Sequence, residues 1–352
     1  MSQEPGLVVL FSSGETSPGS QRIYDWLLSR VDPPIHMAVL ETPAGFQPNT
    51  SVVAEKVADF VRHHLQNHRP EITVVPARKR GTTFSPDSPE IVAPLLQANV
   101  IFAGAGSPTY AVRQLRDSLA WHTLVARHRL GAALVLASAA TIAAGTRALP
   151  VYEIYKVGED LHWVHGLDLM GAYGLSLALI SHWDNREGGA DLDTSRGFLG
   201  RRRFGELLDM LPQDTTVVGI DEHTALVLDV AGEVCHVLGR AGVYLCRGGE
   251  ERTHRSGESF AIHELGPFVT PAPEDGIPLE VWEQVRSLHK AQAKHVALPP
   301  PDALALVEKR EAARARKDWA AADAVREELS RLGFQVEDTP QGPRLRSIDW
   351  SP

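Results

Sequence analysis

Three polar positions, each directly after an apolar run, carry the residue types that acyl transfer requires. They are Ser138, His182 and the acidic pair Asp221-Glu222, with 44 residues from the serine to the histidine and 40 from the histidine to Glu222. A serine hydroxyl attacks a carbonyl carbon when a histidine accepts its proton and an acid holds the imidazole in the right tautomer. Ser138 taken alone is better explained as a helix N-cap, so the prediction of a hydrolytic site depends on all three positions together.

The elements that must position these residues alternate between short apolar runs and amphipathic stretches. Short buried runs predict strands at Leu7–Phe11, Ile35–Leu40, Ile72–Val75, Val100–Phe102, Ala132–Leu136 and Leu175–Ile180. Helical spacing of apolar residues predicts helices at Val52–Leu65, Pro89–Leu96 and Tyr110–Leu124. This alternation predicts an α/β fold, a flavodoxin-like, mainly parallel sheet flanked by helices. Ligands bind such sheets beyond the carboxyl ends of the strands, where all three polar positions fall.

The second half of the chain has a different pattern. Four short runs with turns between them predict an antiparallel, β-rich completion: Thr215–Ile220, Ala225–Val230, Val234–Leu238 and Gly242–Cys246. We therefore expect an α/β domain over residues 1–265. A helical linker over residues 266–301 would end in a hinge at Pro299-Pro300-Pro301, and a small domain of a helical hairpin and a β-hairpin would occupy residues 302–352.

One motif in this chain matches a known family. The stretch from about Gly6 to His263 resembles the cyanophycinase and aspartyl dipeptidase group of serine peptidases, whose fold is similar to class I glutamine amidotransferases. Gly219-Ile-Asp-Glu-His-Thr-Ala225 matches that family's Gly-Ile-Asp-Glu-x-Thr-Ala element at every defined position. The resemblance implies a catalytic triad with Ser138 as nucleophile, His182 as base and Glu222 as orienting acid. It also implies a hydrolase that cleaves a peptide or related amide through an acyl-enzyme.

The nucleophile motif departs from the family, which has Gly-x-Ser-Ala-Gly. Leu136 and Ala140 stand where the family has glycines, and those glycines relieve crowding at a strained turn. Two hypotheses follow. Either the turn is reshaped and the enzyme is active, or the chain is a catalytically degenerate binding protein that uses the same cleft and is coupled through its tail to tRNA or a translation partner. The backbone at Ser138 should distinguish a strained elbow from an ordinary helix cap.

An oxyanion hole is expected next to this nucleophile. Gly104-Ala105-Gly106 follows a predicted strand, and its small residues leave amides free to face an oxyanion. The resemblance assigns these residues and the amide of Ala139 as donors. The alternative is a tight turn capped by Ser107.

The sequence indicates the residues that would recognise a substrate less specifically than it indicates the triad. Arg186, Arg196 and Arg201 are candidates to pair with a substrate carboxylate, although solvated or structural ion pairs are the more ordinary interpretation. The segment Tyr152–Glu159 is expected to form a pocket wall or a subunit contact. We expect no cofactor, and no metal site, because His162 and His165 lack an evident third ligand.

The last fifty residues resemble the C-terminal module of bacterial cysteinyl-tRNA synthetases. The matching residues are the run 311–326, Gly333 and the run 337–342. The resemblance implies tRNA contact near an anticodon. From Pro299 onward, however, nine basic residues face ten acidic ones, and only Arg310, Arg314 and Lys317 form a local basic stripe. A packing module or docking of a partner is therefore the favoured role, with RNA binding second.

The composition of the chain argues against several other classes of protein. The formal charge is −9 and the pI is about 5.9, which argues against nonspecific binding of nucleic acid or anionic membranes by the whole chain. No apolar run approaches the roughly 18–20 residues that span a bilayer. Two cysteines cannot form a disulfide scaffold. We expect a cytoplasmic protein that acts on a small substrate without membrane contact, and a homodimer is left open.

Overall fold

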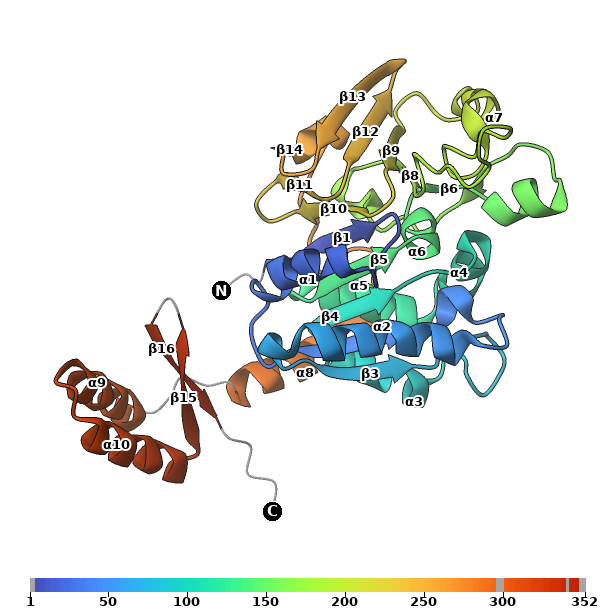
Figure 1. The fold of residues 1–352 in the computed structure, drawn as a ribbon. Helices are drawn as coiled ribbons and strands as arrows, with labels where there is room; N and C mark the ends of the chain where they lie inside the picture. Colours follow the sequence, from blue (N-terminus) through green and yellow to red (C-terminus); the bar gives the residue numbers. More distant parts are fainter. Residues whose placement is uncertain (1–3, 296–300, 340–341, 348–352) are drawn as a thin grey trace. The chain divides into compact units, whose positions relative to one another are not determined.

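The computed structural model describes residues 4–295, 301–339 and 342–347, and the chain divides at Leu288 into two compact units (Figure 1). Two residues of the expected hinge, Pro299 and Pro300, lie outside the described residues. The same holds for Pro340 and Gln341 in the expected β-hairpin. The expected linker differs from the structure, because its residues 266–288 belong to the first unit. Helix α8 (Leu279–His295) starts there, and Trp282 and Val285 are buried against α5 (Leu119–Arg129).

The first unit is built on an eight-stranded sheet with the order β14-β11-β10-β1-β5-β4-β2-β3. The parallel strands are β1 (Val8–Phe11), β5 (Ala133–Ala137), β4 (Val100–Ala103), β2 (His36–Leu40) and β3 (Glu71–Val75). The antiparallel strands are β10 (Thr224–Asp229), β11 (Val234–Gly239) and β14 (Ser259–Ala261). The central strands β1, β5 and β4 are buried throughout, because both faces of the sheet are covered.

Alternate residues of these strands enter two different cores. Val9 and Phe11 pack with helices α1 (Gln21–Leu28) and α2 (Thr50–His64) on one face. Val8 and Leu10 pack on the other face, in a core that includes residues of α5 (Leu119–Arg129). The period of two residues along a strand separates the two sets.

The expected helix Tyr110–Leu124 is wrong in one respect, because it is two helices. Helix α4 spans Pro108–Leu115, and α5 begins after Ser118, whose hydroxyl accepts a hydrogen bond from the N–H of Trp121 at 3.1 Å. Asp117 has a φ of 56°, a left-handed conformation that ends a helix. Local capping therefore interrupts a periodicity that continues on both sides of the break.

A second sheet of six strands has the order β13-β12-β9-β8-β6-β7. Its strands are β6 (Arg147–Ala148), β7 (Val164–His165), β8 (Leu177–Ile180), β9 (Thr216–Ile220), β12 (Gly242–Arg247) and β13 (Glu250–Arg255), and α7 spans Gly200–Leu208. The β-rich completion is therefore divided between the two sheets. The chain passes from β9 in one sheet to β10 in the other (Figure 1). The connecting residues are Asp221-Glu222-His223, so Glu222 lies where the chain changes sheets.

Short helical segments complete the first unit. They are α3 (Pro89–Val92), α6 (Ala139–Ala143), η1 (Pro18–Ser20), η2 (Thr42–Ala44), η3 (Gln66–His68), η4 (Ala93–Leu96), the π-helical η5 (Glu153–Val157), η6 (Gly171–Tyr173) and η7 (Ile262–Leu265).

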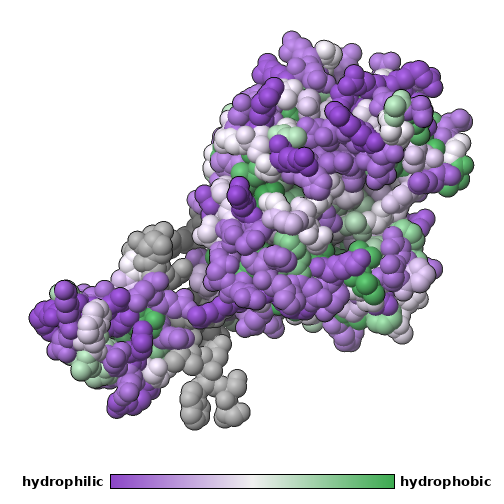
Figure 2. Space-filling model, viewed as in Figure 1, coloured by the Kyte–Doolittle hydropathy of each residue, from purple (hydrophilic) through white to green (hydrophobic). Residues whose placement is uncertain are grey.

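The second unit consists of α9 (Pro301–Ala315), α10 (Trp319–Arg331) and a hairpin of β15 (Phe334–Thr339) and β16 (Gly342–Ser347). Its small core contains Leu306, Leu329 and Val336. The predicted α/β fold with a helical-hairpin and β-hairpin module at the C-terminus is thus confirmed. In the view of Figure 2, hydrophilic side chains dominate the surface of each unit. None of the described helices is both long and apolar enough to cross a membrane.

Candidate active site

Ser138 occupies a strained turn between β5 and α6. Its φ of 50° and ψ of −107° are a conformation that L-amino acids rarely adopt, at a cost of about 1–3 kcal/mol. The N–H of Ser138 donates to the carbonyl of Phe11 at 3.0 Å, and the hydroxyl of Ser181 donates to the carbonyl of Ser138 at 3.2 Å. The Ser138 side chain makes no capping hydrogen bond to α6. The backbone is therefore that of a strained elbow, which leaves the hydroxyl available for other contacts.

The elbow forms with Leu136 and Ala140 in place of glycines. Leu136 is still within β5, paired with Leu10 and Ala103, and its side chain is buried in the core. The hydroxyl of Thr141 connects α6 to the strands β1 and β5, since it is within hydrogen-bonding distance of the carbonyls of Phe11 and Leu136, at 2.8 and 2.9 Å. A leucine two residues before the serine is tolerated because the strained backbone begins only at Ser138.

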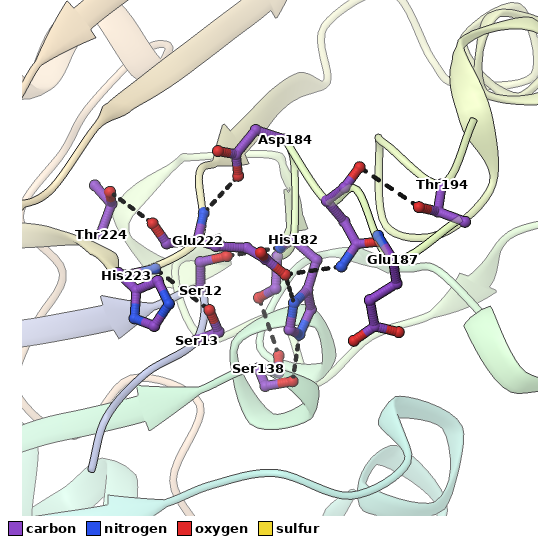
Figure 3. Close-up of polar contacts among 12 residues, drawn as sticks. Ser12, Ser13, Ser138, His182, Asp184, Glu187, Thr194, Glu222, His223 and Thr224 are labelled. Atoms are coloured by element: carbon purple, nitrogen blue, oxygen red, sulfur yellow. Dashed lines mark hydrogen bonds and ion pairs between the residues drawn. The ribbon is translucent and has the colours of Figure 1, made fainter. Parts of the chain in front are cut away.

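The three predicted triad residues form one hydrogen-bonded chain (Figure 3). The Ser138 Oγ lies 3.0 Å from Nε2 of His182, and Nδ1 of His182 lies 2.9 Å from Oε1 of Glu222. The side-chain amide of Asn185 donates to the same Oε1 at 2.8 Å. The hydrogen bond from His182 is the largest cause that lowers the pKa of Glu222, so this carboxylate stays ionised beside the imidazole.

Backbone contacts hold the histidine and the acid in place. His182 follows β8 with a φ of 57°, and its N–H donates to the hydroxyl of Ser12 at 2.6 Å. The N–H of Glu222 donates to Oδ1 of Asp184 at 2.7 Å. Ser12 follows β1 of the first sheet, whereas His182 follows β8 of the second sheet. The carboxyl ends of strands from both sheets therefore converge on this site.

The loop after β4 lies next to the elbow. The N–H of Ala140 donates to the carbonyl of Gly104 at 3.3 Å. Gly106 has a φ of 151°, and a Cβ there would lie 1.8 Å from the carbonyl oxygen of Pro43. Ser107 caps α4, as the turn interpretation expects, and accepts a hydrogen bond from the N–H of Tyr110 at 3.2 Å. Ala139 is the first residue of α6, so its N–H has no acceptor within that helix.

A cavity of about 310 Å³ opens at Ser138 and His182. Gly106 and Ala139 line it, whereas Gly104 and Ala105 line a neighbouring cavity of about 120 Å³. The other residues that line the larger cavity are Pro108, Ile142, Val151, Tyr152, Tyr155, Lys156, Glu187, Gly197 and Phe198. The ring of Phe198 lies 5.1 Å from that of His182, centroid to centroid, and provides an aromatic wall.

The three arginines expected to bind substrate are not among the residues that line this cavity. The guanidinium of Arg196 lies 3.8 Å above the ring of Trp183, and burial lowers its pKa. The N–H of Arg201 donates to Oδ2 of Asp193 at 2.9 Å, and the Arg186 side chain is exposed.

Two charged residues of the cavity were not singled out as site residues from the sequence. Lys156 belongs to the segment Tyr152–Glu159, for which a pocket wall was one of the two expectations. Glu187 follows His182 in an insertion with no recognisable pattern. Figure 3 shows its carboxylate beside the pair of His182 and Ser138. Within the described residues, no group of three or more His, Cys, Asp or Glu side chains is arranged to hold a metal ion.

Comparison with known proteins relates the second unit to a tRNA ligase. Residues 299–346 match the family model described as the cysteinyl-tRNA ligase anticodon binding domain. The cysteine–tRNA ligase of Streptomyces avermitilis is 62% identical over 39 residues, which are 11% of this chain and 8% of that protein. The ligase of Methanosarcina mazei is 34% identical over 98 residues, 26% of this chain and 21% of that protein. The chain thus spans only about a fifth or less of the length of these relatives.

Solved structures relate the first unit to peptidases. The crystal structure of a peptidase from an acI-B1 actinobacterium aligns with 74% of this chain and 98% of its own, with a TM-score of 0.59 and 22% identity. A putative peptidase E protein from Listeria monocytogenes aligns with 71% of this chain and 98% of its own, with a TM-score of 0.43 and 12% identity. At 22% identity the likeness to the actinobacterial peptidase shows the fold alone. The first unit therefore shares the fold of this actinobacterial protein, and the C-terminal residues match a tRNA-ligase module, as the two resemblances predicted.

Proposed function

We propose that this chain is a serine-type hydrolase that cleaves a peptide or related amide through an acyl-enzyme at Ser138. The single observation that carries the proposal is the strained Ser138 with its hydroxyl 3.0 Å from Nε2 of His182. A strained turn persists only where the surrounding structure holds it, and such turns cluster at active sites. The peptidase fold of the first unit supports the same reaction class.

The proposed reaction uses this geometry. As the Ser138 Oγ bonds to the substrate carbonyl carbon, Nε2 of His182 accepts the hydroxyl proton, and Glu222 stabilises the resulting imidazolium. The amides of Ala139 and Gly106, which both line the cavity, donate to the developing oxyanion. The carbon–nitrogen bond then breaks as His182 gives its proton to the leaving amine. Water attacks the acyl-enzyme by the same steps and releases the acid.

Labelling with a fluorophosphonate tests the proposal without a known substrate, because the probe phosphonylates an activated serine. We expect intact-mass analysis to show one adduct on the wild-type chain and none on Ser138→Ala. Ser29→Ala is the matched control, since Ser29 is exposed and bonds only near its own helix. Absence of an adduct on the wild type, or equal labelling of Ser138→Ala, would instead favour the degenerate binding protein.

The match of residues 299–346 favours a second candidate function, contact with tRNA. The expected basic stripe does not support it directly, because Arg310 and Arg314 both bond to Asp338. Contact would therefore have to use other cations, such as Arg316 and Lys317. Filter binding of tRNA over a salt series tests this. We expect binding that weakens with salt and is lost in Arg316→Gln/Lys317→Gln and on truncation at Leu298. No binding at low salt would exclude the role.

A further inference from the structure

A third and larger cavity, of about 650 Å³, lies next to the candidate active site. We call it the cationic cavity, and it is lined by Phe11, Ser13, Gly14, Ser17, Gly19, Ser20, Arg22, Ile23, Trp26, His223, Leu238, Gly239, Arg240, Ser256 and Gly257. None of these residues belongs to the triad. Two of them are chain neighbours of residues that contact His182, because Ser13 follows Ser12 and His223 follows Glu222.

The charges that line the cationic cavity all have one sign. Arg22 and Arg240 are always charged, and no lining residue in the described chain is acidic. Neither guanidinium forms an ion pair with any described carboxylate, whereas Arg78 and Arg202 are both paired. Arg22 and Arg240 therefore form a local concentration of unneutralised positive charge, although the whole chain carries a formal charge of −9.

Neutral groups in the same cavity can also donate to an anion. The hydroxyl of Ser13 accepts from the N–H of His223 at 3.3 Å, so its own hydrogen remains free to bond a ligand. Gly14 and Gly239 have φ values of 75° and 115° and no side chains to cover their backbone, whereas the N–H of Gly257 already donates to the carbonyl of Val237 at 2.8 Å. A Cβ at Gly14 would lie 2.2 Å from Nδ1 of His223, so a glycine there is needed for that ring to lie against the loop.

Part of the remaining lining is apolar, alongside Ser17, Ser20 and Ser256. Phe11, Ile23, Trp26 and Leu238 contribute carbon surface, and the volume exceeds what a single phosphate or carboxylate group would fill. The occupant should therefore have an anionic group and an organic body of its own.

We propose that the cationic cavity binds a small organic anion, a phosphate ester or a polycarboxylate, with its anionic oxygens at Arg22, Arg240 and His223. This site is separate from the proposed hydrolytic site and does not depend on its activity. Planar guanidinium groups suit phosphate and carboxylate oxygens equally, because each presents paired donors to paired acceptors. The body of the ligand lies against Trp26 and its apolar neighbours.

Isothermal titration calorimetry at low ionic strength tests the proposal, with adenosine monophosphate, citrate and inorganic phosphate as probes. We expect saturable binding of adenosine monophosphate or citrate, and the stronger of the two identifies the ligand class. Inorganic phosphate should bind about tenfold more weakly, because it lacks the organic body. In Arg22→Gln/Arg240→Gln the affinity should fall by about tenfold or more, because the charged donors to the anion are lost. Both side chains are exposed, so the fold should persist.

Arg62→Gln/Arg202→Gln is the control, because it removes the same charge from helices outside the cavity. Its affinity should stay within about twofold of the wild type. The ring signals of His223, assigned by comparison with His223→Asn, should shift on titration. The proposal is overturned if neither organic anion binds up to about 10 mM, or if the control loses as much affinity as the cavity variant. A shift confined to other histidines would overturn it as well.

Discussion

The side-chain amide of Asn185 donates to Oε1 of Glu222 at 2.8 Å, and that oxygen also accepts the hydrogen bond from Nδ1 of His182. Asn185 is almost fully buried, so it lies as a fixed donor behind the carboxylate of Glu222. One carboxylate oxygen thus receives two donors, which sets the orientation of the carboxylate relative to the imidazole ring.

Asn185→Ala should slow fluorophosphonate labelling by about three- to tenfold, since a net hydrogen bond contributes about 1 kcal/mol. The rate constant for adduct formation measures this. Asn67→Ala, at an exposed asparagine on the same unit, should label at the wild-type rate. An unchanged rate for Asn185→Ala would mean that His182 alone suffices to orient Glu222.

Glu222→Gln should slow labelling far more, by roughly 10³–10⁴-fold, because the amide no longer holds the imidazole in the tautomer that accepts the serine proton. The substitution is nearly isosteric, so circular dichroism should show an unchanged fold. Labelling within about tenfold of the wild type would exclude Glu222 as the orienting acid.

Ala140→Gly introduces the glycine that the resemblance to the cyanophycinase group leads one to expect two residues after Ser138. Because the elbow at Ser138 already forms with alanine, we expect labelling within about twofold of the wild type. Glycine within α6 should reduce the free energy of unfolding by about 0.5–1 kcal/mol. Chemical denaturation and labelling rates separate the two effects. A large gain in labelling rate would show that Ala140 holds the elbow away from its reactive geometry.

Asp221 should make stability depend on pH. Burial, reinforced by the nearby Asp184, raises the pKa of Asp221 to about 6, and its Oδ1 has no hydrogen-bond partner in the described chain. The folded protein therefore holds this proton more tightly than the unfolded chain does. The contribution of Asp221 to stability is full below about pH 4 and is lost as the pH rises through about 6.

Asp221→Asn removes this titration. We expect the wild type to lose about 1 kcal/mol of unfolding free energy between about pH 4 and 7, after allowance for solvent screening, and the variant to lose less over the same range. Urea unfolding at a series of pH values measures the difference. If the unfolding free energies of the two proteins change with pH in parallel, the pH dependence does not come from Asp221.

Asp338 in the second unit joins the hairpin to α9. It accepts two hydrogen bonds from the buried Arg310, at 2.9 and 3.0 Å, and one from Arg314 at 2.6 Å. The bonds from Arg310 are the main cause that lowers the pKa of Asp338 to about 2. The stabilisation is therefore present above about pH 4, where the free carboxyl ionises, and is lost as the pH falls through about 2.

Asp338→Asn should destabilise the second unit by about 1–3 kcal/mol at pH 7, because charge-assisted bonds to a buried guanidinium are lost. Hydrogen exchange should quicken in α9 and β15 and stay unchanged in the first unit. Asp323→Asn, at an exposed residue of α10, is the control and should leave exchange unaltered. Unchanged protection from hydrogen exchange in Asp338→Asn would show that the ion pair of Asp338 and Arg310 contributes no stability.

The sequence by itself determined the local structure and the composition of the candidate triad. Short β-branched runs predicted nearly every strand of the first sheet within a residue or two, because burial on both faces demands an unbroken apolar run. Turn chemistry marks both ends of α10, since the side chain of Asp318 accepts a hydrogen bond from the N–H of Ala321 and Gly333 is left-handed, with a φ of 81°. These features depend on neighbours in the chain, so a sequence pattern can reveal them.

Only the tertiary structure decided which strands pair and what each polar side chain contacts. The runs on either side of Glu222 look alike, yet β9 and β10 join different sheets, because apolar periodicity reports burial and not the pairing partner. Arg196 stacks on Trp183 instead of facing the cavity, while Lys156 and Glu187 line it from segments that carry no motif. The positive φ of Ser138 likewise follows from its contacts with Phe11 and Ser181, which are distant in sequence and adjacent only in the fold.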